Sequence, residues 1–146
     1  MKNLKYPKNC YGTLTGEIHY WKVYENIAKL FGNILLEVMK KDYSGDYYHF
    51  LYEKDGKYGY LQFGYGPCQC CDLILGCKNN EEIEKAIEIL ESEIIWFDNK
   101  QEMNQYFQQY DWEGNYGYSR IFNNIVLDFC NIENYVIEKK YIIIDN

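Results

Sequence analysis

The chain has 146 residues, of which 47% are apolar and 25% charged, a composition that supports a folded core and argues against disorder. Its formal net charge is −7, with 15 lysines and arginines against 22 acidic residues, which disfavours direct binding to DNA or RNA because such binding needs clustered cations. An acidic surface favours a basic partner protein, or it simply keeps a chain with 17 tyrosines in solution.

The length predicts one domain, residues 1–146. No apolar run approaches the roughly 18 residues that a membrane span requires. The first residues, Met1–Lys5, lack the apolar core of a signal peptide. We therefore expect a cytoplasmic protein, in which thiols stay reduced and an even number of cysteines does not indicate disulfides.

The first half of the chain predicts a helix followed by three strands. Helical spacing of apolar residues runs from Glu17 to Phe31, after an irregular segment at 1–16, and Gly32 and the residue after it supply a stop signal. Residues 34–63 alternate in the manner of an antiparallel meander. Asp55-Gly56 is a strong hairpin signal, since both central residues of such a turn prefer positive φ.

The second half predicts two helices and a final strand. Asn79 or Asn80 caps a helix whose apolar face holds Ile83, Ile87, Leu90 and Ile94. Asp98 is expected to cap a shorter helix, with Gln101 three residues on and a buried stripe at Met103, Phe107 and Tyr110. Segment 121–129 fits a helix or a strand, and 135–144 reads as a strand.

The predicted fold class is therefore α+β. A small antiparallel sheet, made of the meander at about 34–63 plus a C-terminal strand, is packed by two to three helices.

Four cysteines fall within ten residues, at 68–77. Cys68 and Cys71 form a C-x2-C pair, and Cys77 can add a third zinc ligand if the chain turns back. A second C-x2-C pair is missing, so a fourth ligand must come from elsewhere; the candidates are Cys10, Cys130, His19, His49 and Asp72.

Two other interpretations of this block stay open. Gly64, Gly66 and Pro67 favour a tight corner under which small cysteines pack, and this interpretation is preferred to zinc binding. A thioredoxin-like redox site is the weaker alternative, because the block follows a hairpin strand rather than opening the helix of a βαβ unit.

The sequence contains few residues suited to acid–base or nucleophilic catalysis. His19 and His49 are the only histidines, and no spacing supports a dyad of Cys71 with His49. We therefore expect no enzyme, no catalytic residue and no cofactor other than a possible zinc ion. Asp111-Trp112-Glu113 is instead typical of an exposed, acidic, aromatic turn.

The order of these motifs resembles a group of small uncharacterised proteins of phages and mobile elements of low-GC bacteria. The resemblance covers residues 43–114 and rests on the Gly64-Tyr65-Gly66 turn with the following cysteine block, on Trp96-Phe97-Asp98, which should end a helix, and on Asp111 to Gly114. Cys70 departs from the pattern, since a glycine is expected there. The group implies no catalytic residues; such proteins resemble inhibitors of host defence, including anti-CRISPR proteins.

The charge and the resemblance together suggest a function. We expect a protein-binding inhibitor of a basic, nucleic-acid-handling defence effector such as a CRISPR effector, with Tyr110 and Trp112 as anchors and Asp111 and Glu113 as steering charges. The alternatives are an immunity protein against a nuclease toxin and a zinc- or cysteine-stabilised regulatory module of a mobile element.

Overall fold

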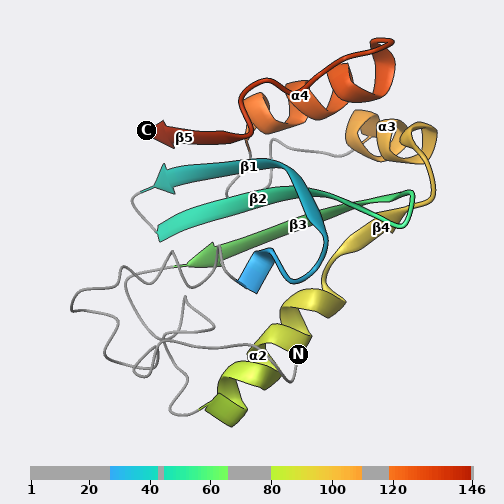
Figure 1. The fold of residues 1–146 in the computed structure, drawn as a ribbon. Coiled ribbons are helices and arrows are strands. Elements are labelled where there is room, and N and C mark those ends of the chain that lie inside the picture. The colour runs from blue at the N-terminus through green and yellow to red at the C-terminus, as the bar shows by residue number, and fades with distance from the viewer. Residues whose placement is uncertain (1–26, 43–44, 66–79, 110–118, 146) are drawn as a thin grey trace.

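A computed structural model describes residues 27–42, 45–65, 80–109 and 119–145 of the chain (Figure 1). Within these residues, one mixed sheet has the strand order β4-β3-β2-β1-β5. The strands are β1 (Asn33–Asp42), β2 (Gly45–Lys54), β3 (Lys57–Tyr65), β4 (Ile95–Phe97) and β5 (Tyr141–Asp145). The helices are α2 (Asn80–Ser92), α3 (Lys100–Gln109) and α4 (Arg120–Asn131). The predicted α+β class is confirmed, and the sheet is mostly antiparallel.

The meander forms as predicted. β1 pairs antiparallel with β2, and β2 pairs antiparallel with β3. The β2–β3 turn has positive φ at both central residues, 53° at Asp55 and 79° at Gly56, as the sequence indicated. A bulge between Ile34 and Leu36 is the one irregularity of the β1–β2 pairing.

The two outer strands differ from the expectation. β5 runs parallel to β1, which makes the sheet mixed, and it begins at Tyr141 rather than at residue 135. β4 pairs Trp96 with Gly59 of β3, so the segment predicted to end a helix is a strand. The prediction failed there because a three-residue strand is fixed by its pairing partner and not by local periodicity.

Side chains alternate between the two faces of the sheet, and each face carries its own apolar core. Tyr48, Phe50 and Tyr52 of β2 pack with α2, in a core that also contains Ile27, Phe31, Ile83 and Leu90. Leu51 packs with α3 and α4 on the other face, with Met103, Phe107, Phe122 and Val126. Figure 1 shows α2 below the sheet and the other two helices above it.

Helices α3 and α4 begin at recognisable caps. The predicted helix α2 is confirmed, and its predicted cap Asn79 lies outside the described residues. The cap of α3 is Asn99 and not Asp98: the Glu102 N–H donates to Asn99 Oδ1 at 2.9 Å. The Glu102 carboxylate in turn accepts from the Asp98 N–H at 3.0 Å, which satisfies a second free donor at this helix end. Ser119 caps α4, and this helix settles the ambiguous segment 121–129.

Most of the helix predicted from Glu17 to Phe31 lies outside the described residues. In the part of this segment that is described, Ile27 and Ala28 are helical. No helix within the described ranges is long and apolar enough to cross a membrane.

Candidate functional site

Most of the site residues named from the sequence fall outside the described ranges. These are Cys68, Cys71 and Cys77 of the cysteine block and Tyr110, Asp111, Trp112 and Glu113 of the acidic turn. The zinc site and the aromatic anchors therefore stay predictions. In the part of the chain that the structure describes, no three His, Cys, Asp or Glu side chains lie close enough to hold a metal ion.

His49 is a core residue. It is fully buried in β2, and its Nδ1 lies 2.9 Å from the Tyr60 hydroxyl, which also donates to Gln62 Oε1 at 3.2 Å. The imidazole lies against the ring of Phe122, with centroids 5.3 Å apart. A general acid or base must reach the proton that it transfers, so these contacts support a structural role for His49.

Cys130 is half-buried near the end of α4. Burial raises the pKa of its thiol to about 11, and the nearby Lys100 ammonium lowers it only in part. Because metals and electrophiles react with the thiolate, a thiol that stays protonated at neutral pH is a poor ligand and a poor nucleophile.

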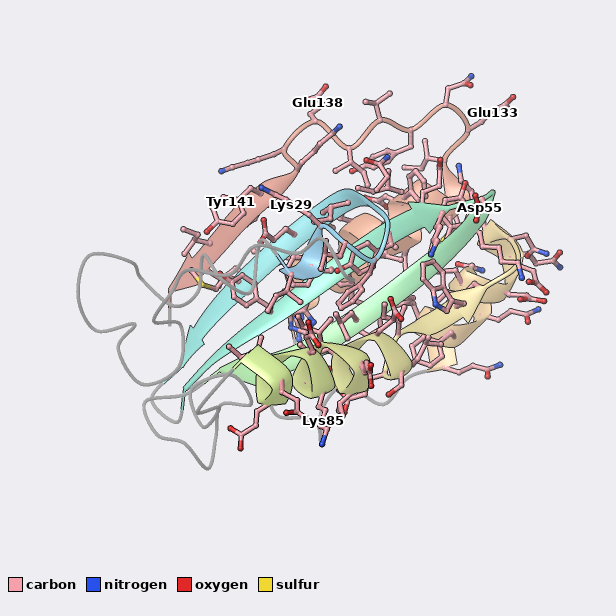
Figure 2. All side chains as sticks on the ribbon, turned by 60° about the horizontal axis from the view of Figure 1, so that its bottom comes forward. Lys29, Asp55, Lys85, Glu133, Glu138 and Tyr141 are labelled. Carbon is pink, nitrogen blue, oxygen red and sulfur yellow. The ribbon has the colours of Figure 1, made fainter. Side chains whose placement is uncertain are left out.

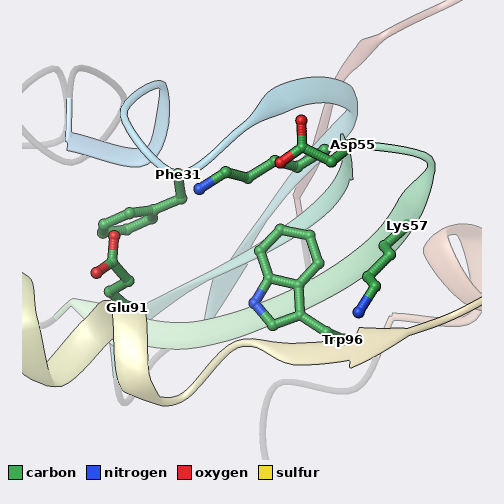
Figure 3. Close-up of a pocket in the computed structure, with 6 residues that line it drawn as sticks. Phe31, Asp55, Lys57, Glu91 and Trp96 are labelled. Carbon is green, nitrogen blue, oxygen red and sulfur yellow. The ribbon is translucent and has the colours of Figure 1, made fainter.

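A groove of about 480 Å³ lies where the β2–β3 hairpin, α2 and β4 meet (Figure 3). It is lined by Phe31, Lys54, Asp55, Lys57, Glu91 and Trp96. Lys57 forms an exposed ion pair with Asp98, with 3.3 Å between Nζ and Oδ1. The indole of Trp96, 38% exposed, is the large aromatic surface of this groove.

The position of Trp96 depends on a glycine in the neighbouring strand. A Cβ atom on Gly59 would lie 2.7 Å from Cζ3 of the indole, so only glycine leaves room for the ring. On its inner side the indole contacts the buried ring of Tyr52, with centroids 6.4 Å apart. Burial, and secondarily the Glu37 carboxylate, raise the pKa of Tyr52, which keeps its phenol neutral behind the groove.

The outer face of α2 is strongly acidic. Its exposed glutamates are Glu81, Glu82, Glu84, Glu88 and Glu91, and Lys85 is the only cation of the helix. In Figure 2, Lys85 points away from the sheet into solvent. Glu91 belongs both to this face and to the groove, so the acidic face continues to Trp96.

This surface has the chemistry to accept a cationic side chain. A guanidinium or ammonium group can lie over an indole face and pair with a carboxylate beside it, and Trp96 and Glu91 offer both within one groove. The groove is open and its own charges balance, since two lysines face two acidic residues. Net attraction for a basic partner therefore comes from α2.

No family model, curated protein or solved structure matches this chain.

Sequence reasoning missed this groove because it assigned Trp96 to a helix end. Two signals point to the strand: Ile95, Trp96 and Phe97 are all good strand formers, and Gly59 lies between two tyrosines in the middle of a strand. A glycine within a strand often marks close approach of another group, here the indole of Trp96.

Proposed function

We propose that this protein is a protein-binding inhibitor of a basic bacterial protein that handles nucleic acid, in the manner of an anti-CRISPR protein. One observation carries the proposal: the acidic outer face of α2 runs through Glu91 into a groove with a half-exposed tryptophan. A net charge of −7 supports the same choice of partner.

The two parts of this surface have different tasks. The carboxylates of α2 compete with phosphates for a basic groove and steer the encounter, which makes association fast and sensitive to salt. Trp96 supplies an anchor that the partner would bury, since tryptophan in a pocket with a polar rim is typical of residues that dominate binding energy. Blocking the partner's basic groove would exclude its guide or target nucleic acid.

The acidic turn at 110–113 is a second proposed contact, with Trp112 as its anchor. Binding in the cytoplasm of a bacterial host, to a CRISPR effector or to a nuclease, belongs to the same proposal. An immunity protein against a nuclease toxin would use the same surface on another partner.

The proposal is tested by affinity capture with matched charge variants. Tagged protein is expressed in a defence-bearing low-GC host, and the lysate is treated with nuclease before capture. Glu84→Lys/Glu88→Lys reverses two charges on α2. Glu133→Lys/Glu138→Lys makes the same charge change at exposed positions that Figure 2 places far from Lys85 of α2.

The proposal expects a stoichiometric basic protein to be captured by the wild type and by the control pair, and lost with the α2 pair and at high salt. Trp96→Ala should weaken its affinity by about tenfold or more. Equal capture by both charge-reversed proteins would exclude the α2 surface, and loss only with Trp112→Ala would move the interface to the acidic turn.

A further inference from the structure

The groove beside α2 holds two carboxylates that are available to a ligand. Asp55 and Glu91 line it and, within the described residues, neither is part of an ion pair. Of the two lysines in the lining, Lys57 is bound to Asp98, which is not part of the lining, and Lys54 remains as the opposing cation. Among the described residues, an entering cation therefore meets two unpaired carboxylates and one unpaired ammonium group.

The aromatic surface of the groove is fixed before a ligand arrives. The six-membered ring of the Trp96 indole lies over Gly59, where a Cβ would be 2.7 and 2.8 Å from two of its carbons. The buried ring of Tyr52 contacts the indole from the sheet, while 38% of Trp96 stays exposed. Because the ring is already held in place, little conformational freedom is lost when a ligand binds over it.

The two carboxylates come from different elements. Glu91 belongs to the last turn of α2, and Asp55 lies in the β2–β3 turn. Figure 3 shows their carboxylates on different sides of the Trp96 ring. A ligand that lies on the indole and bonds to these carboxylates must be flat, cationic and able to donate hydrogen bonds along more than one edge.

A guanidinium group meets these requirements better than an ammonium group. It is planar, it stacks on an aromatic face, and it carries its N–H donors in a fixed fork that matches a carboxylate. A lysine ammonium is a compact charge that water hydrates more strongly, so it gains less from leaving water for the indole.

We propose that the groove takes an arginine side chain of the basic partner in preference to a lysine. The inference rests on the proposed function for the partner, and it adds which of the partner's side chains Trp96 receives. Arginine is also the residue that binds phosphate through two parallel hydrogen bonds. An arginine held in this groove is therefore withdrawn from nucleic acid.

The preference is measured with two capped lysine peptides that differ only at the central residue, which is arginine in one and lysine in the other. The exposed glutamates of α2 attract both peptides equally, so the ratio of the two Kd values isolates the groove. Calorimetry at low salt gives both Kd values for the full chain. The NMR signal of the Trp96 indole N–H, assigned by its loss in Trp96→Leu, shows whether the arginine peptide lies on the ring.

The arginine peptide should bind the wild type about fivefold tighter than the lysine peptide. Trp96→Leu keeps an apolar side chain without an aromatic face, and Glu91→Gln removes a carboxylate; each should bring this ratio below about twofold. Glu88→Gln is the matched control, since it makes the same charge change on the exposed face of α2 outside the groove. It should weaken both peptides and leave their ratio unchanged.

A ratio near one in the wild type would overturn the arginine preference. So would a ratio that survives both Trp96→Leu and Glu91→Gln, or one that falls equally with Glu88→Gln. Glu91 is exposed, so its variant tests the groove even if Trp96→Leu does not fold. The peptide titration is separate from the capture experiment: a clear arginine preference with no basic protein captured would support this inference and contradict the proposed function alone.

Discussion

The close contact between Gly59 and Trp96 gives the sharpest prediction about the groove. In Gly59→Ala, the new Cβ would lie 2.7 and 2.8 Å from two indole carbons and 3.1 Å from Cγ2 of Ile94. Carbon atoms in contact are normally about 3.5–4.0 Å apart, so the indole must move by roughly 1 Å or swing into solvent.

The size of the effect follows from two opposing contributions. Overpacking at a buried position costs about 1–3 kcal/mol, and replacing glycine by alanine returns about 0.4–1 kcal/mol by restricting the unfolded chain. We expect Gly59→Ala to lower the free energy of unfolding by about 1–2 kcal/mol, toward the lower end because the half-exposed Trp96 ring can yield.

A double-mutant cycle isolates the contact. In a Trp96→Ala background most of the clash disappears, so Gly59→Ala should be neutral or stabilise by about 0.5 kcal/mol. Urea unfolding followed by far-ultraviolet circular dichroism measures all four proteins at comparable m-values. If Gly59→Ala costs the same free energy in both backgrounds, the indole does not occupy the space above Gly59 and the proposed anchor is misplaced.

Four further predictions concern the core and the two ends of α4. Ser119→Ala should lower the free energy of unfolding by about 1 kcal/mol, because it removes the α4 cap, whereas Ser92→Ala at an exposed helix end should cost less in the same urea titration. Tyr60→Phe should cost about 1–2 kcal/mol, since its hydroxyl bonds the buried His49 ring; an unchanged denaturation midpoint would argue against that bond. Alkylation of Cys130, followed by peptide mass spectrometry, should be slow at pH 7 and rise toward pH 11. The pKa of Cys130 is raised above its ordinary value of about 9, so between pH 9 and 11 the thiol ionises in the unfolded chain before it ionises in the folded protein. The free energy of unfolding should therefore fall as the pH rises through this range.

Local signals in the sequence were sufficient to predict the central hairpin and α2. Asp55-Gly56 fixes the hairpin because few residue pairs accept two positive φ angles. The spacing of Ile83, Ile87 and Leu90 predicted α2, since one apolar stripe can only face the sheet.

The outer strands and α4 depended on contacts distant in sequence. β4 is a strand because Trp96 pairs with Gly59, and the direction of β5 follows from its place beside β1. In the segment 121–129 apolar residues are too dense for either period to stand out, and Ser119 as a cap was the missed signal.

The candidate site was harder to predict than the fold. The sequence drew attention to cysteines and to Trp112, residues with conspicuous chemistry in short motifs. The described groove joins Phe31, Glu91 and Trp96 from three separate segments, which no local pattern relates. The glutamates of α2 are visible in the sequence, but their continuity with Trp96 depends on the fold.

The most direct test of the proposed inhibition is to titrate the captured basic protein, bound to its labelled guide or target nucleic acid, with this protein. We expect the wild type and Glu133→Lys/Glu138→Lys to abolish nucleic-acid binding at about one equivalent, whereas Glu84→Lys/Glu88→Lys should require at least about tenfold more. Retention of the nucleic acid at saturating wild-type protein would contradict the proposed inhibition.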